Sequence, residues 1–164
     1  KFKNISILQI DAHADLRDSY MGSKYNHACA LHDANNNAHL VQVGIRSMDI
    51  SENQFINRDS VFFAQDMFGA TQWMDQSINL LNEQVYITLD LDAFDPSIMP
   101  STGTPEPGGI LWNDMLTYLK KVFQNKNVVG FDIVELAPIK NLEAPNFLVA
   151  KLYYKMLSYK FHMK

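Results

Sequence analysis

Apolar residues gather into five short runs, which are separated by longer segments where apolar positions recur at helical spacing. The runs are nearly continuous, which is typical of strands buried on both faces of a parallel sheet. We predict strands at residues 5–10, 40–45, 61–64, 85–91 and 128–134.

The segments between the later strands predict helices. One is expected over residues 71–83, one with Asn113 as its N-cap, and one that begins near Pro145. Polar residues 17–26 predict a loop, and the Asn run at 35–37 indicates a break. Strands that alternate with helices predict a single α/β domain over residues 1–164, with a mainly parallel sheet.

Composition and charge narrow the choice of partners. Hydrophobic residues make up 47% and charged residues 20% of the chain, which is ordinary for a globular protein. The net charge of −4 and the absence of a Lys/Arg-rich run disfavour a nucleic-acid partner. The apolar stretches are too short for a bilayer span, so no membrane partner is expected. Cys29 is the only cysteine, which fits a reducing, cytoplasmic setting.

The start of the chain predicts truncation at the amino end. The first residue is Lys1, and a buried-type strand begins within the next few residues. Because a strand inside a parallel sheet needs neighbours on both sides, we expect residues 1–164 to be the carboxyl-terminal portion of a longer domain.

Acidic and histidine residues follow three of the predicted strands. In open parallel sheets, ligands bind beyond the carboxyl ends of the strands, so these residues are predicted to converge on one crevice. They are Asp11, His13 and Asp15 after the first strand, Asp90 and Asp92 after the fourth, and Glu135 after the last.

The spacing within each cluster has a physical logic. Alternate residues of an extended chain point to the same side, so Asp90 and Asp92 can share a face, as can Asp11, His13 and Asp15 if extension persists. Four carboxylates at close range repel one another, and divalent cations remove that cost. Carboxylates with one imidazole suit manganese or another first-row ion. The alternative is that each Asp-x-Asp is a loop or cap element and His13 an ordinary polar residue.

Three motifs resemble those of the ureohydrolase (arginase/agmatinase) family. Residues 7–15 read ILQIDAHAD, residues 88–96 read TLDLDAFDP and continue to a Pro-, Thr- and Gly-rich loop ending at Gly109, and residues 130–138 read GFDIVELAP. Each is similar to a family signature, and together they cover essentially the whole chain in the family's order. The resemblance implies a three-layer α/β/α fold.

The resemblance also implies a site that holds two Mn²⁺ ions. Asp11 and Asp90 would bridge the ions, His13 and Asp92 would complete one of them, and Asp15 would bind the other. The family has an upstream Gly-Gly-Asp-His type segment whose histidine ligates the same ion as Asp15. Residues 1–164 lack that segment, so one metal site is expected to be incomplete in this chain.

The family's catalytic and substrate-binding roles fall on three residues here. Glu135 would hold the substrate guanidinium, because a carboxylate suits its planar fork of donors. Asp15 would take up the proton of the attacking water. His27 stands where the family has a histidine that relays a proton to the leaving amine.

The substrate is predicted less sharply than the reaction. Residues 15–20 and 26–28 look like the subgroup labelled agmatinase, so agmatine, cleaved to putrescine and urea, is the first choice and arginine the second. Formimidoylglutamate and guanidinobutyrate stay open because Arg17 could pair with a carboxylate, although a loop salt bridge to Asp18 or another subunit is its commoner role.

Two readings from other classes stay open beside the hydrolase. The first is a non-catalytic metal-binding or assembly subunit, because part of one metal's ligand set is missing. The second is a deacetylase of related fold, which would use a single zinc ion. Family resemblance implies a homo-oligomer, a trimer or a hexamer.

Overall fold

A five-stranded parallel sheet forms the centre of the computed structural model, which describes residues 2–162. The strand order is β3-β2-β1-β4-β5. The strands are β1 Ser6–Ile10, β2 His39–Ile45, β3 Val61–Phe63, β4 Gln84–Asp90 and β5 Asn127–Val134. All five predicted strands are confirmed to within one residue at either end.

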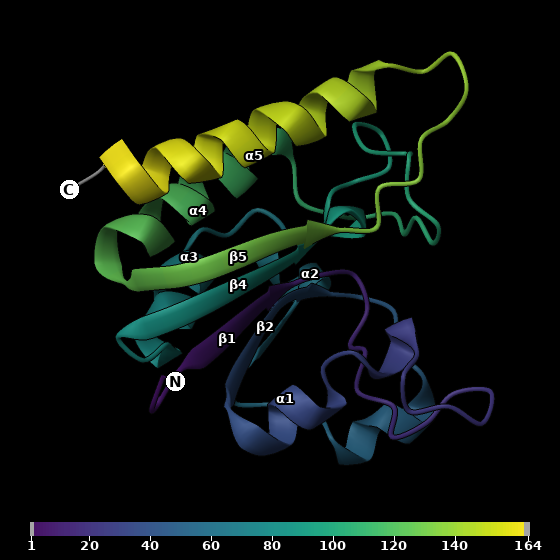
Figure 1. Cartoon of the computed structure of the whole chain (residues 1–164), viewed down its shortest axis with the longest axis vertical. Helices are drawn as coiled ribbons and strands as arrows, with labels where there is room; N and C mark the ends of the chain where they lie inside the picture. The colour runs from purple at the N-terminus through teal and green to yellow at the C-terminus, as the bar shows by residue number, and fades with distance from the viewer. Residues whose placement is uncertain (1, 163–164) are drawn as a thin grey trace.

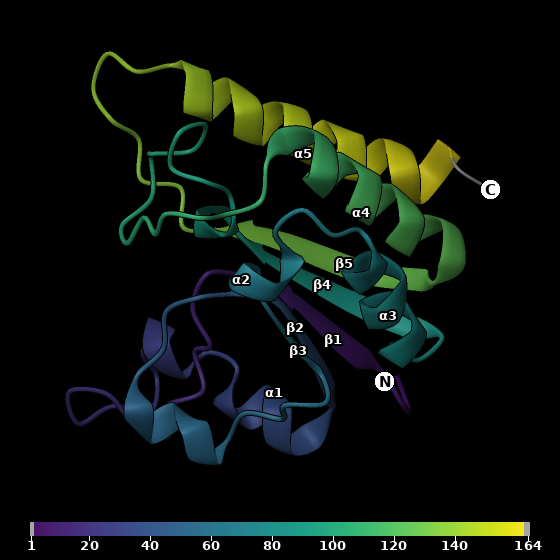
Figure 2. The ribbon, with the colours of Figure 1, turned by 180° about the vertical axis from the view of Figure 1, so that it is seen from behind.

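Helices cover both faces of this sheet and confirm a three-layer α/β/α arrangement. Figures 1 and 2 show α4 and α5 on one side of the strands and α1 on the other. The helices are α1 His32–Asn37, α2 Ala64–Met67, α3 Gln72–Leu80, α4 Trp112–Asn125 and α5 Ala144–His162. Short 3-10 turns lie at η1 His27–Cys29, η2 Ile50–Gln54 and η3 Leu91–Ala93.

Each face of the sheet has its own apolar core. Leu8, Ile10 and Val43 belong to a large cluster that also contains buried residues of α3, α4 and α5. On the opposite face, Leu40 and Ile45 pack with side chains from the turns around α1 and η2. Burial on both faces explains why the strands read as continuous apolar runs.

The predicted break at the three asparagines is wrong, because α1 runs through them. Asn36 Nδ2 donates to His32 O at 3.1 Å, and Asn37 Nδ2 donates to Asp33 O at 2.8 Å. Asn35 Nδ2 instead reaches Phe55 O. These amides satisfy backbone carbonyls of a short helix, which propensity alone does not reveal.

The predicted boundaries of two helices also need correction. Asn113 does not cap α4, because the helix begins at Trp112 and its N-cap is Leu111. The preceding residue, Ile110, is bonded to Ala93 and Asp95, so the chain stays extended up to that point and then turns at once into the helix. The helix predicted to reach residue 83 ends at Leu80.

Within residues 2–162, none of the helices combines the length and the apolar character that a bilayer crossing requires.

Candidate metal centre

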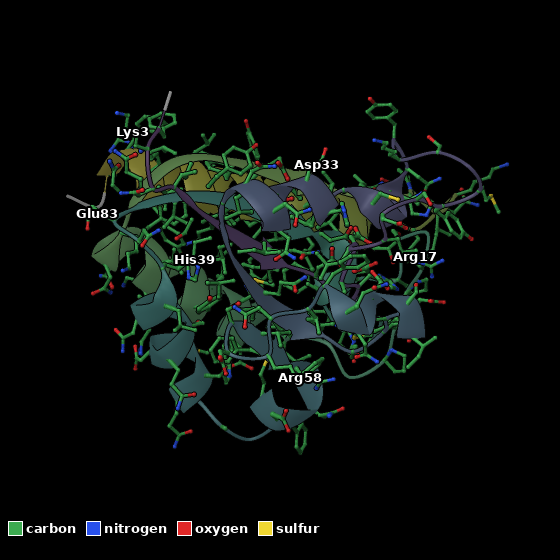
Figure 3. The ribbon with its side chains drawn as sticks, turned by 90° about the horizontal axis from the view of Figure 1, so that it is seen from below. Lys3, Arg17, Asp33, His39, Arg58 and Glu83 are labelled. Atoms are coloured by element: carbon green, nitrogen blue, oxygen red, sulfur yellow. The ribbon has the colours of Figure 1, made fainter. Side chains whose placement is uncertain are left out.

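The register of the sheet brings the acidic strand ends to one edge. Ile10 of β1 pairs with Leu89 of β4, so Asp11 and Asp90 are the next residues on adjacent strands. Asp90 in turn pairs with Val134 of β5, and Glu135 follows. Figure 3 shows Arg17, just beyond this edge, at the opposite end of the molecule from Lys3 and Glu83, which precede β1 and β4.

Three of the predicted ligands form a compact group. One ligand atom each from Asp11, His13 and Asp92 lies within 4.8 Å of the others. His13 Nδ1 is 3.0 Å from Asp92 Oδ2 and 3.7 Å from Asp11 Oδ1. The backbone N–H of Ala12 donates to Asp92 Oδ1 at 3.1 Å, which ties the ends of β1 and β4 together. This group could hold a metal ion.

Asp15 and Asp90 lie outside the compact group but line the same cavity. Extension does not persist to Asp15, whose φ of 54° is in the left-handed region, so strict alternation fails there. Asp90 ends β4, and its Oδ1 accepts the backbone N–H of Asp92 at 2.9 Å because the chain turns into η3. The two clusters therefore meet through loop geometry as well as strand alternation.

Crowded carboxylates dominate the electrostatics of this site. Burial raises the pKa of Asp90 to about 9, and repulsion from Asp11 and Asp92 adds to the rise. Burial and the charge of Asp11 likewise raise the pKa of Asp15 to about 8. The carboxylates of Asp11 and Asp92 raise the pKa of His13 to about 10. Asp15, Asp90 and His13 therefore retain their protons at neutral pH in the metal-free protein.

The three acidic tips open into one cavity of about 470 Å³. Glu135 lies on its wall next to Gly103, and its φ of 66° is left-handed. His27 is exposed at the rim, with its ring edge-on to Tyr20 at a centroid distance of 6.2 Å. The structure therefore brings together the residues to which the sequence assigned metal, substrate and proton-transfer roles.

Two buried glutamines hydrogen-bond the segment that follows β1, residues 11–14, which we call the β1 tip. Sequence reasoning missed both glutamines. Gln9 Nε2 donates to Asp11 Oδ2 at 2.8 Å and to His13 O at 3.1 Å. Gln42 Nε2 donates to Gln9 Oε1 at 2.6 Å and to Ala14 O at 3.0 Å. The available signal was a polar amide within each of two apolar strands, where burial requires a hydrogen-bond partner.

The wall of the cavity at Arg17, its outer wall, carries two acidic partners of that residue, Asp49 and Glu52, that sequence reasoning missed. Arg17 Nη2 lies 3.6 Å from Asp49 Oδ2, and its Nε lies 4.0 Å from Glu52 Oε2. The guanidinium also stands 4.7 Å from the centre of the Tyr20 ring. Glu52 is buried and accepts backbone N–H groups from Leu16 and Asp49. The predicted salt bridge of Arg17 thus joins Asp49 rather than Asp18.

Comparison with known proteins places these motifs in a family. A family model described as the arginase family matches residues 1–158. The chain belongs to the arginase family. Among curated relatives of this arginase-family chain, the N(1)-aminopropylagmatine ureohydrolase of Synechocystis sp. is 37% identical over 164 residues, covering 94% of this chain and 52% of that protein.

Other members of the arginase family are similar to this chain in sequence and in structure. The agmatinase of Pyrococcus horikoshii is 34% identical over 155 residues, covering 93% of this chain and 54% of that protein. The crystal structure of agmatine ureohydrolase from Thermoplasma volcanium gives a TM-score of 0.82 at 31% identity, covering 96% of this chain and 55% of that one. The predicted resemblance to ureohydrolases, agmatinases above all, is confirmed, and the chain spans about half the length of these relatives.

Proposed function

We propose that this chain supplies most of a binuclear manganese site that hydrolyses a linear guanidino compound to urea and an amine. The observation that carries the proposal is the convergence of the two ligand segments. Asp11 and His13 of one segment and Asp92 of the other offer ligand atoms within 4.8 Å, and Asp90 faces the same cavity.

The donor set fits divalent ions. Buried carboxylates that raise one another's pKa values are costly as anions, and bound cations remove that cost. Carboxylate oxygens with one imidazole nitrogen match the ligand preferences of Mn²⁺. We assign Asp11, Asp90, His13 and Asp92 as the residues that would hold one ion, and Asp11, Asp90 and Asp15 as those that would hold the other. When bound, two such ions would act as Lewis acids and lower the pKa of a water in the cavity.

The chain's own residues supply binding and proton transfer. Glu135 would accept N–H groups of the guanidinium and orient its carbon toward the acidic cluster. Asp15, on the same cavity wall, would take up the proton of the attacking water. His27 would pass a proton to the leaving amine, and its exposed position at the rim connects that amine with solvent.

The charges of the outer wall favour a substrate with a cationic tail. Arg17 is already paired with Asp49 and Glu52, so this wall carries one more negative than positive charge among those three residues. A carboxylate tail, as in guanidinobutyrate or formimidoylglutamate, would meet Asp49 unfavourably. Agmatine, converted to putrescine and urea in polyamine synthesis, remains the first choice. N(1)-aminopropylagmatine, named for the Synechocystis relative, is the alternative with a longer amine tail.

Two properties of the whole protein complete the proposal. We expect a homo-oligomer, a trimer or a hexamer, as the family resemblance implies. We expect it to act in the cytoplasm, because the one cysteine of residues 1–164, Cys29, is a free, buried thiol that needs no oxidising compartment.

The proposal is tested by urea release from the complete protein loaded with Mn²⁺. Agmatine, N(1)-aminopropylagmatine, arginine, formimidoylglutamate and guanidinobutyrate would be compared by kcat/KM. Amine-tailed substrates should exceed carboxylate-tailed ones by at least about 10-fold. Asp90→Ala should abolish both Mn²⁺ binding and urea release.

Each contrary outcome has a distinct meaning. Normal turnover by Asp90→Ala would refute the metal assignment. Tight Mn²⁺ binding without urea release from any of the five compounds would favour the non-catalytic metal-binding role. Preference for a carboxylate tail would overturn the substrate argument and leave the reaction class standing.

A further inference from the structure

Arg46 follows β2 directly, and its side chain is committed entirely to backbone carbonyl groups. Five hydrogen bonds hold the half-buried guanidinium. Nη2 donates to the carbonyl oxygens of Asp92 at 2.7 Å and Glu106 at 2.8 Å and shares an N–H with that of Phe94 at 3.4 Å, while Nε donates to Pro107 O at 3.0 Å and Nη1 to Gly44 O at 3.1 Å. Within residues 2–162, no carboxylate forms a salt bridge with Arg46.

The backbone of the same residue holds the other ligand segment. The N–H of Arg46 donates to Ala12 O at 2.8 Å, and the N–H of Ser47 donates to the same oxygen at 3.0 Å. Ala12 lies between the candidate ligands Asp11 and His13. Arg46 therefore contacts the β1 tip through its main chain. Its side chain contacts Asp92, in the segment that follows β4.

The side chain also secures the loop at residues 103–109 against the site. Glu106 and Pro107 are bound through their carbonyl oxygens, while Thr104 Oγ1 lies 3.3 Å from Asp92 Oδ2. Gly103 and Thr104 line the same cavity as the acidic cluster. One planar cation thus joins the backbone of Asp92 to the loop that touches its carboxylate.

We propose that Arg46 is a positioning residue that sets the distance between the two metal-ligand segments and holds the loop at residues 103–109 against Asp92. The inference rests on the proposed metal site. We infer that Arg46 acts through the geometry of its hydrogen bonds rather than through its charge, because a guanidinium holds its N–H donors in a fixed plane. A lysine ammonium has three donors on a flexible stem and cannot span carbonyl groups that lie in different directions.

The decisive measurement is Mn²⁺ affinity, determined by calorimetric titration of the complete protein below its melting temperature. Arg46→Lys retains the charge, and Arg46→Ala removes it. Both should weaken Mn²⁺ binding by about 10- to 100-fold, as loss of a group that orients metal ligands typically does. Guanidinium ion at a low, non-denaturing concentration should restore affinity to Arg46→Ala, whereas methylammonium at equal concentration should not.

A matched control separates positioning from general loss of stability. Tyr118→Phe removes a buried hydroxyl that is bonded to Ser77 between α3 and α4, away from the cavity. It should lower the melting temperature without changing Mn²⁺ affinity. If neither Arg46 variant folds, Thr104→Val probes the same loop from its other end and should weaken Mn²⁺ binding.

The outcomes that overturn the inference differ from those that overturn the function. Wild-type affinity in Arg46→Lys would assign Arg46 a charge effect only. Unchanged affinity in Arg46→Ala, or in Thr104→Val where the Arg46 variants are unfolded, would remove the positioning role altogether. A wild-type protein that binds no Mn²⁺ would instead refute the proposed metal site.

Discussion

Asp15 and Glu135 line the same cavity from different strand ends, and both hold a left-handed backbone, with φ of 54° and 66°. For residues other than glycine this conformation costs about 1–3 kcal/mol. Glutamate gains less than aspartate from local hydrogen bonds in this region, so the strain is greater at Glu135. Both residues place a carboxylate at the cavity, and their strained backbone lowers the stability of the fold.

Glu135→Gly should stabilise the fold while it impairs substrate binding. Glycine removes the left-handed strain, and after its larger loss of chain entropy the net gain is about 0.5–1 kcal/mol. Glu135→Gln keeps the strain and should leave stability unchanged, while both variants should raise KM. Chemical denaturation and steady-state kinetics on the pair test this, and a glycine variant less stable than the glutamine variant would contradict it.

Asp90→Asn should stabilise the metal-free protein and weaken Mn²⁺ binding. Burial and repulsion from Asp11 and Asp92 raise the pKa of Asp90 to about 9, so Asp90 must take up a proton on folding at neutral pH, and asparagine removes that cost. The substitution also removes one proposed metal ligand. Asp75→Asn is the matched control, because Asp75 forms an exposed pair with Lys121 that contributes about 0–1 kcal/mol. Relative to the wild type, the melting temperature of Asp90→Asn should be higher with a chelator and lower with Mn²⁺. The melting temperature of Asp75→Asn should show no such opposite shifts.

The metal-free protein should lose stability as the pH rises from about 4 to about 10. Folded Asp15 and Asp90 keep protons up to pKa values of about 8 and about 9, whereas the unfolded groups release them near 3.8. Folded His13 stays protonated up to about 10, against 6.5 when unfolded. The folded state thus binds more protons throughout this window, so each step up in pH favours unfolding.

Bound Mn²⁺ should reverse this trend, because the ligands must release their protons to bind it. The rise in melting temperature on adding Mn²⁺ should therefore be larger near pH 8 to 9 than near pH 6. Melting curves at both pH values, with and without Mn²⁺, make the comparison. A metal-free protein whose stability increases over this window would show that the cluster is not crowded as described.

Gln9→Leu should disturb the metal site through hydrogen bonds rather than volume. It leaves Asp11 and the Gln42 amide network without a buried partner, at a cost of about 1–3 kcal/mol. Mn²⁺ affinity should fall by about 10-fold or more because the β1 tip loses its anchor. Leu8→Ala, on the opposite face of β1, is the control; it should cost about 2–5 kcal/mol without a comparable change in affinity.

The sequence predicts the strands and the meeting of their acidic ends, because apolar runs and sheet register follow from local patterns. It does not predict the side-chain contacts that complete the site. The amides of Asn36 and Asn37 turn an expected break into helix α1, since they satisfy carbonyls one turn back. The left-handed backbone of Asp15 and the five carbonyl partners of Arg46 depend on distant loops, which local propensity does not encode.

The two strands whose carboxyl ends lead into the candidate metal ligands, β1 and β4, are neighbours in the interior of the sheet, each flanked on both edges. Interior strands exchange their amide hydrogens last, because they open only when the whole sheet does. The strand ends that position the ligands should therefore not unfold separately from the rest of the sheet. Loss of activity on heating and global unfolding should occur at the same temperature.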